Sequence, residues 1–452
     1  MGFLGEVKNK KSAKKILGAI LILLLVFVLT VLSYLVYLAV DYSRIGNIDV
    51  EVHNNINTKL NKSKVESESL TISTYNIGFG AYSREYSFFM DKAEFKAEFA
   101  ESQNRTNTVG KYSRAISKDA EIANTNGAYQ TISEKIIPTY GEVDFALYQE
   151  VDTGSTRSYQ VNQLTLGDLA HEDYARVFAS NYHSGYLMYP FASPIGASNS
   201  GITTYSKYEV AEAKRKEFTV STVFVDKFFD LDRAFTVSQI EIEGMDASLF
   251  IFNVHMSAYD ESGLIRKAQL IDLKNAVAEA STFNDQENYV IVGGDFNHDL
   301  IISSDKTDLA DATWFNEQEL DGYKTDWYNF LRADATIADG TDFLNPKTGK
   351  VEPYAKDLDG VDLSAYGPVN LPSARDASIP FEDKNRNGII DNFMCSIDGF
   401  LVSSNINVLH VETVGSGVNG QTEDLLPSDP RYGYGFVYSD HNPVVMEFSL
   451  IV

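Results

Sequence analysis

The stretch Tyr289-Val-Ile-Val-Gly-Gly-Asp-Phe-Asn297 is an apolar run that ends in a carboxylate and an amide two residues apart. Its β-branched residues predict a buried strand, which places Asp295 and Asn297 at the edge of a sheet. Side chains at i and i+2 point the same way along a strand, so an acceptor and a donor can converge there on a phosphate or a metal-bound water. An Asx turn after a strand explains the same residues without a function. This stretch alone does not decide between the two interpretations.

The same arrangement, an apolar run next to polar groups suited to catalysis, recurs along the chain. The runs 70–75, 145–148 and 249–254 lead into Asn76, Gln149-Glu150 and His255, Asp398 stands at the start of the run 397–402, and Ser439-Asp440-His441 precedes the run 444–448. Open α/β sheets bind ligands at strand ends. Six such ends in one domain therefore predict a shared catalytic rim.

These six pieces, in this order, resemble the endonuclease/exonuclease/phosphatase superfamily. Its members include DNase-I-like nucleases, exonuclease-III-like abasic-site nucleases, neutral sphingomyelinases and inositol-polyphosphate phosphatases. The resemblance covers about residues 70–452, and Gly294-Asp-Phe-Asn297 and Ser439-Asp-His441 are its most specific blocks. It implies a four-layer α/β sandwich, with two mixed sheets face to face and helices outside. It also implies hydrolysis of a phosphoester by water with Mg²⁺, or Mn²⁺ in its place.

The resemblance assigns a role to each rim residue. It implies Glu150, Asn76 and Asp440 as metal ligands, His441 as general base, Asp398 as the acid that orients His441, Asp295 as the group that orients the water or binds metal, Asn297 and His255 as donors to the phosphate, and Arg233 as support for the rim or a phosphate clamp. It does not separate Asp295 from Asp440 as the second metal-side acid. A structural salt bridge is the alternative for Arg233, and a satisfied polar residue is the alternative for His255. Gly399 stands where many relatives carry Tyr, so substrate contacts beside Asp398 are expected to differ.

The N-terminus predicts a membrane anchor. Residues 16–40 carry no charge and are rich in Leu, Ile and Val, which suits the roughly 20 apolar residues that cross a bilayer. Five lysines lie within residues 8–15 and Asp41 follows the run, so the positive-inside rule predicts a cytoplasmic segment 1–15 and an extracytoplasmic catalytic domain, 70–452. Residues 41–69 are polar and are expected to form a stalk, although 45–52 could form a short strand. A cleaved signal peptide is the alternative, but its apolar core is usually only about 7–15 residues long.

Charge and cysteine content exclude some classes of function. The formal net charge is −25, from 63 acidic and 38 basic residues, so no general attraction to nucleic acid or anionic lipid is expected. A metal and one local Arg can still hold a single phosphate. The only cysteine, Cys395, excludes an intramolecular disulfide framework.

Two long connections carry further expectations. Residues 79–126 form a longer first connection than the family usually has, which could be a lid or a passive elaboration, and about 301–389 is expected to supply helices and substrate-facing loops. Within the second connection, Asp383-Lys-Asn-Arg-Asn-Gly-Ile-Ile-Asp391 resembles the start of a calcium loop, with Gly at the sixth position. Met394 stands at the twelfth position, where an acid should close the cage. An Asx-rich turn is therefore the alternative to a structural Ca²⁺ site.

The sequence as a whole predicts a membrane-anchored, outward-facing, metal-dependent phosphoesterase. Nucleic acid, a phospholipid headgroup and an inositol phosphate remain open as substrates, and no protein partner is predicted. The alternative is a non-catalytic, membrane-tethered binding module that keeps the fold. A degenerate module should have lost rim positions, whereas all of them are present here.

Overall fold

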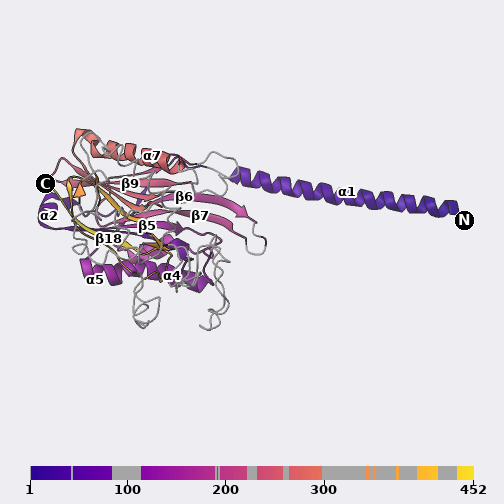
Figure 1. Cartoon of the computed structure of the whole chain (residues 1–452), viewed down its shortest axis with the longest axis horizontal. Coiled ribbons are helices and arrows are strands. Elements are labelled where there is room, and N and C mark those ends of the chain that lie inside the picture. The colour runs from indigo at the N-terminus through magenta and orange to yellow at the C-terminus, as the bar shows by residue number, and fades with distance from the viewer. Residues whose placement is uncertain are drawn as a thin grey trace, which may run out of the picture.

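A computed structural model of the 452-residue chain describes residues 2–41, 44–83, 114–188, 191, 194–220, 232–257, 264–297, 343–345, 350–351, 373–375, 394–395, 397–415 and 435–452. Two β-sheets form the body of the molecule (Figure 1). The predicted helix around Phe95 and Phe99, the segment with Trp314 and Trp327, and the calcium-loop candidate at 383–391 lie outside the described residues.

The first sheet is built around the run that opens with Tyr289. Its strand order is β1-β8-β9-β10-β11-β16-β12-β13, and β3 pairs separately with β9. The strands are β1 Ile48–Asp49, β3 Leu60–Asn61, β8 Glu212–Glu217, β9 Ala234–Glu243, β10 Ser248–His255, β11 Tyr289–Asp295, β12 Phe343–Asn345, β13 Lys350–Val351 and β16 Asp398–Ser403. Strands β10 and β11 run parallel, and the other paired neighbours on this path run antiparallel. The sheet is therefore mixed.

The second sheet has the order β17-β18-β4-β5-β7-β6-β2. Its strands are β2 Val52–His53, β4 Leu70–Asn76, β5 Phe145–Asp152, β6 Ala175–Leu187, β7 Gly196–Ser206, β17 Ile406–Thr413 and β18 Val444–Leu450. Strands β4 and β5 are parallel and central. A separate pair, β14 Ala374–Arg375 and β15 Met394–Cys395, lies beside the two sheets.

Three apolar clusters hold the layers together. The cluster between the sheets joins residues such as Ile72 and Leu147 of the second sheet to Ile251 and Ile291 of the first, all fully buried. Because successive residues of a strand face opposite sides, the alternate residues of both sheets meet helices on the outer faces.

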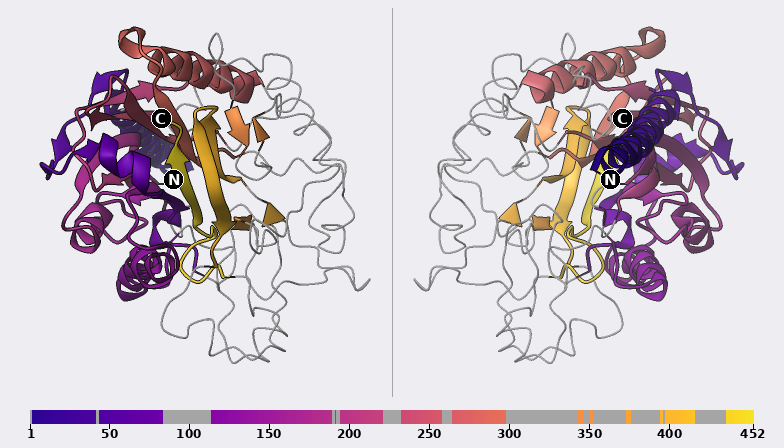
Figure 2. Two further views of the ribbon diagram at one scale, coloured as in Figure 1. Left: turned by 90° about the vertical axis from the view of Figure 1, so that its left-hand side faces the viewer. Right: turned by 90° about the vertical axis from the view of Figure 1, so that its right-hand side faces the viewer.

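The outer helices cover the two sheets from opposite sides (Figure 1; Figure 2). Helix α7, Leu264–Ser281, packs on the outer face of the first sheet. Helices α4, Lys118–Thr131, and α6, Gln163–Ala170, pack on the second sheet, and the short α5, Ile137–Tyr140, continues from α4 through a π-helical turn. The result is the four-layer α/β sandwich that the resemblance implied.

The segment expected to be a stalk takes part in both sheets. Strands β1 and β3 pair with the first sheet and β2 pairs with the second, and helix α2, Lys62–Ser67, follows β3 with Asn61 as its N-cap. Residues 48–67 therefore belong to the folded body rather than to a free linker. A two-residue strand has no signal of its own, because its partners decide whether it pairs.

Helix α1, Gly2–Asp41, extends away from the body (Figure 1; right-hand view of Figure 2). Its part Lys14–Asp41 contains an 18-residue window with a mean hydropathy of 3.1, and none of that window is buried against the rest of the chain. This one helix of the described chain is long and apolar enough to cross a membrane.

Candidate active site

Strand register brings three of the predicted residues side by side in the first sheet. His255 at the end of β10 pairs with Asp295 at the end of β11, and Asp295 pairs with Asp398 at the start of β16. Two parallel strands and one antiparallel strand thus place their polar ends at the same edge. The rim predicted from strand ends follows directly from this register.

The second sheet supplies the facing half of the rim. Asn76 ends β4 beside Gln149 of β5, and Nδ2 of Asn76 donates a hydrogen bond of 2.9 Å to Oδ2 of Asp295. This bond crosses from one sheet to the other. A second bridge runs deeper, where Nε2 of Gln149 donates to Oδ1 of Asn253 at 2.8 Å. The two sheets are therefore fixed against each other at the rim by side chains of β4, β5, β10 and β11.

Asp295 is the centre of the constellation. Besides the Asn76 amide, its Oδ2 atom lies 3.6 Å from Nε2 of His255 and 3.9 Å from Nε2 of His441. Its Oδ1 atom accepts the backbone N–H of Asn297 at 2.8 Å. Asp295 is buried, so its carboxylate is held in one orientation by groups from both sheets.

His441 and Asp398 form a buried hydrogen-bonded pair. Nδ1 of His441 lies 2.7 Å from Oδ2 of Asp398, so Nδ1 is the donor and Nε2 faces the rim. Burial raises the pKa of Asp398 to about 6, against the attraction of His441. Burial lowers the pKa of His441, but Asp398, Asp295 and Asp440 together hold that pKa well above its usual value. Ser373 supports the pair, because its hydroxyl accepts the backbone N–H of Asp398 at 3.0 Å.

Glu150 reaches the rim through an irregularity in its strand. The β5–β7 register shifts between Tyr148 and Val151, and Glu150 has a left-handed backbone with φ of 57°. This bulge aims Oε1 of Glu150 to within 3.6 Å of Nε2 of His255. A strained non-glycine residue costs about 1–3 kcal/mol and persists only where its surroundings require it.

Charge crowding at Glu150 is the main electrostatic feature of the site. Burial and then the nearby Asp440 raise the pKa of Glu150 to about 7, while His441 and Arg157 act in the opposite direction. Asp440 is also buried and accepts a hydrogen bond of 3.2 Å from Ser439 Oγ. A partly buried and a buried carboxylate that destabilise each other's charge are an arrangement that a divalent cation would relieve.

His255 and Arg233 lie close enough to interact electrostatically. Burial, and then the charge of Arg233, holds the pKa of His255 well below its usual value, so this imidazole is neutral. Its buried Nδ1 atom has no hydrogen-bond partner among the described residues. Arg233 is buried directly before β9. The structure therefore places Arg233 beside the rim.

Asn297 takes a different position from the one expected. It does not point with Asp295 toward a common ligand, because its Nδ2 atom donates to the backbone oxygen of Met256 at 2.7 Å. Its φ is 49°, a conformation that Asn tolerates better than most residues. In the structure Asn297 fastens the end of β11 to the residue after β10 and caps Asp295 through its backbone N–H.

The two glycines before Asp295 belong to the strand and not to a turn. A Cβ on Gly293 would lie 2.7 Å from Leu147 and Phe400, and a Cβ on Gly294 would overlap the carbonyl of Val254. Gly294 also has φ of 144°, outside the usual range of other residues. Close approach of β10 and β11 at the rim therefore depends on glycine here.

Arg157 is a rim-side residue that the sequence analysis did not single out. It binds Asp152 through two hydrogen bonds, of 3.0 and 2.9 Å, and its guanidinium lies 3.2 Å from the centre of the Phe79 ring. Its charge acts on Glu150 and His255. Its position five residues after Asp152 carries no recognisable pattern, so only the fold reveals it.

The described residues contain one group of acids and histidine whose ligand atoms lie mutually within 4.8 Å, and it consists of Asp295, Asp398 and His441. This group could hold a metal ion. The expected ligand set was different, namely Glu150, Asn76 and Asp440. Oδ1 of Asn76 accepts the backbone N–H of Gly78 at 3.0 Å, which leaves that oxygen one further lone pair.

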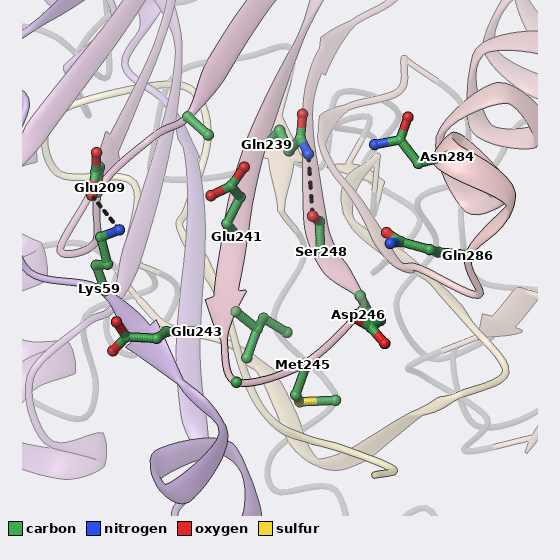
Figure 3. A pocket seen from close by; sticks show the side chains of 14 residues that line it. Lys59, Glu209, Gln239, Glu241, Glu243, Met245, Asp246, Ser248, Asn284 and Gln286 are labelled. Carbon is green, nitrogen blue, oxygen red and sulfur yellow. Dashed lines mark hydrogen bonds and ion pairs between the residues drawn. The ribbon is translucent and has the colours of Figure 1, made fainter.

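A separate pocket lies at the other end of the first sheet. It has a volume of about 330 Å³ and is lined by residues of the β9–β10 hairpin, including Glu241 and Glu243 of β9 and Asp246 of the turn (Figure 3). His255 lies at the opposite end of β10 from this turn. The pocket is therefore distinct from the rim, and none of the predicted site residues lines it.

Comparisons with known proteins find similar structures but no related sequence. No family model matches the chain, and no curated protein matches it. An endonuclease/exonuclease/phosphatase family protein from Leptotrichia buccalis has a TM-score of 0.44 at 10% identity, covering 84% of this chain and 100% of that chain. TDP2 of D. rerio, complexed with a single-strand DNA product, has a TM-score of 0.43 at 11% identity, covering 84% and 99%. The human Nocturnin catalytic domain with bound sulfate has a TM-score of 0.40 at 14% identity, covering 84% and 94%. Because these TM-scores lie below 0.5, no residue's role is taken from these structures.

Proposed function

We propose that the chain is a membrane-anchored, metal-dependent phosphoesterase whose active site is the rim between the two sheets. The single observation that supports this most strongly is the convergence of Asn76, Glu150, His255, Asp295, Asp398, Asp440 and His441 at one edge, from six separate segments of the chain. Buried acids and histidines are costly to the fold. Such a cluster is best explained by chemistry that needs it.

Glu150 and Asp440 are the proposed metal ligands, with the side-chain oxygen of Asn76 as a third donor. The fit rests on the raised pKa of Glu150 and on hard oxygen donors, which suit Mg²⁺ or Mn²⁺. Asp295, Asp398 and His441 are the less favoured set, because His441 already donates Nδ1 to Asp398. A bound divalent ion would neutralise charge on the phosphate and on the leaving oxygen.

His441 in its unprotonated form is the proposed general base, with Asp398 as the residue that orients it; a bound cation would oppose the acids that hold the pKa of His441 above its usual value. The hydrogen bond at Nδ1 leaves Nε2 directed toward Asp295, 3.9 Å away, so a water between them can be oriented by one group and deprotonated by the other. His255, with Arg233 behind it, would donate a hydrogen bond from its neutral imidazole to the phosphoryl oxygens. Asn297 is proposed to support the rim from the side of β11, with any contact to the phosphate secondary to that role.

The proposed location follows from α1. With residues 1–15 cytoplasmic and residues 16–40 across the bilayer, the folded part of the chain, including the catalytic domain at 70–452, faces outward. Nucleic acid, a phospholipid headgroup and an inositol phosphate are the substrate classes compatible with this proposal.

Hydrolysis assays on the full chain, in detergent or in lipid, test the proposal. Plasmid DNA, RNA, sphingomyelin, phosphatidylcholine and inositol phosphates form the substrate panel, and His441→Ala is assayed beside the wild type. His410→Ala is the matched control, because His410 lies on β17 next to Tyr140 and Glu412 and away from the rim. We expect turnover of one class that His441→Ala abolishes and His410→Ala leaves intact. A folded protein that hydrolyses nothing would favour a tethered binding module, and turnover that His441→Ala leaves intact would contradict the proposed base.

A further inference from the structure

The hairpin of β6 and β7 projects beyond the rim and ends in exposed apolar side chains. Tyr186, Met188 and Phe191 are 41%, 47% and 83% exposed, respectively. The sequence from Ser184 to Ser206 contains no charged residue, although the chain has a net charge of −25. Scattered apolar residues on a surface need no explanation, but an uncharged tip with three large exposed side chains does.

Strand directions place this tip on the same side of the molecule as the rim. Strands β4 and β5 are parallel, and β5 and β6 are each antiparallel to β7, so β4, β5 and β6 all run toward the same end. Ser200 of β7 pairs with Asp152, where β5 ends, and with Tyr182 of β6. Strand β6 continues five residues further, to Leu187, which corresponds to about 17 Å. The hairpin therefore overhangs the edge that carries Glu150.

Helix α1 contacts this same tip. The Tyr34 hydroxyl donates to the backbone oxygen of Tyr186 at 3.0 Å and accepts from the backbone N–H of Met188 at 3.1 Å. The Tyr37 hydroxyl accepts from the backbone N–H of Tyr186 at 3.0 Å. Figure 1 shows the hairpin reaching toward the end of α1 where the helix meets the body.

The position of the contact along α1 sets the depth of the tip. A bilayer core takes about 20 residues of helix. Within the apolar run 16–40, the hydrocarbon core counted from Ile16 therefore ends at Leu35, and residues 36–40 lie in the interfacial layer. Tyr34 and Tyr37 then lie at the far boundary of the hydrocarbon, where interfacial tyrosines are enriched. Because Tyr186 and Met188 hydrogen-bond to these two tyrosines, the hairpin tip lies at the same depth.

We propose that the β6–β7 tip is seated in the interfacial layer of the bilayer that α1 crosses, and that it holds the rim facing the lipid surface. This inference rests on the membrane anchoring proposed above. The partner is the lipid surface itself, because the apolar tip continues the exposed apolar surface of α1 and carries no charge. The site then acts on phosphoesters within about 20 Å of the membrane.

Depth-dependent quenching tests the inference without any assay of activity. The full chain with Cys395→Ser receives Met188→Cys or Phe191→Cys, is labelled with an environment-sensitive nitrobenzoxadiazole fluorophore, and is reconstituted in phosphatidylcholine vesicles. Leu169→Cys is the matched control, because Leu169 is an apolar residue 64% exposed on α6. Circular dichroism checks that each variant folds, and vesicle flotation after a carbonate wash checks that α1 anchors the chain.

The inference predicts that the two tip labels are quenched by lipid carrying a shallow doxyl group and protected from aqueous iodide, whereas the Leu169→Cys label shows the reverse. If iodide quenches the tip labels as strongly as it quenches the Leu169→Cys label, on protein that floats with the vesicles, the inference is overturned. Tip labels protected from both quenchers would mean that a protein surface covers the tip, which also overturns it. If the protein does not float with the vesicles, α1 does not anchor it and the inference fails with the proposed anchoring. The proposed chemistry is tested separately by the hydrolysis assays.

Discussion

Replacing Asp398 by Asn removes one charge from the rim and very little else. Asn has nearly the same shape, and its side-chain oxygen can still accept the hydrogen bond from Nδ1 of His441, which is 2.7 Å in the structure. The fold should survive, because His441 can lose its proton and become neutral. No unpaired charge is then buried beside the new amide side chain. The change therefore isolates the electrostatic part of the pair.

The expected loss follows from the distance between the two groups. At the 2.7 Å separation of His441 Nδ1 and Asp398 Oδ2, two unit charges interact by roughly 6 kcal/mol at an effective dielectric constant of about 20, and this is the upper limit of the stabilisation of a protonated His441 that Asp398→Asn removes. Proton transfer by a positioned base contributes roughly 10²- to 10⁴-fold to a rate, or about 3–5 kcal/mol. We expect kcat to fall within that range while KM changes little.

Steady-state kinetics and thermal denaturation measure the two sides of this prediction. Asp144→Asn is the matched control, because Asp144 is also a buried acid with a raised pKa, hydrogen-bonded to the Tyr208 hydroxyl at 2.6 Å and remote from the rim. Equal losses of kcat in the two variants, or unchanged kcat in Asp398→Asn, would refute a catalytic role for the pair.

Three further changes test other parts of the structure. Glu150→Gly removes a left-handed non-glycine residue and a partly buried acid whose pKa is raised to about 7. The free energy of unfolding should therefore rise by about 1 kcal/mol while hydrolysis is lost; a lower melting temperature with full activity contradicts this. Burial lowers the pKa of His171 to about 4 from 6.5, so the unfolded chain binds more protons between these values and stability should fall by up to about 3 kcal/mol as pH drops from 6.5 to 4. Urea unfolding against pH measures this, and His171→Gln should flatten the profile. Gly294→Ala should lower the free energy of unfolding by about 3 kcal/mol or more, because its Cβ would overlap the carbonyl of Val254. A Cβ on Gly46 would have nothing within 4 Å, so Gly46→Ala should melt like the wild type. Equal melting temperatures of the two variants would argue against the close approach of β10 and β11.

The parts of the fold that the sequence predicts are those with strong local signals. The run ending at Asp295 reads as a buried strand and forms β11, and Asp398 begins β16 as expected. Strand ends with polar residues gather at one edge because pairing aligns them, so the candidate rim follows from the order of the runs. The two glycines before Asp295 look like turn residues in sequence, yet they sit inside β11 because the neighbouring strands leave no room for a Cβ.

Other features depend on contacts that no local pattern encodes. The short strands at 48–61 form only because β6, β8 and β9 offer free edges to pair with. Arg157 is bound to Asp152 by the path of the chain after β5, and from there its charge acts on Glu150. The Asn297 amide turns to Met256 because of its own backbone conformation. Each of these placements is set by tertiary structure rather than by propensity.

The dependence of hydrolysis on metal tests the central claim most directly. The full chain is treated with EDTA, freed of chelator, and assayed on the active substrate class before and after addition of Mg²⁺ or Mn²⁺, with Glu150→Gln alongside. The account predicts that activity disappears with the metal, returns on its addition, and does not return in Glu150→Gln. Full hydrolysis after removal of divalent ions would contradict it.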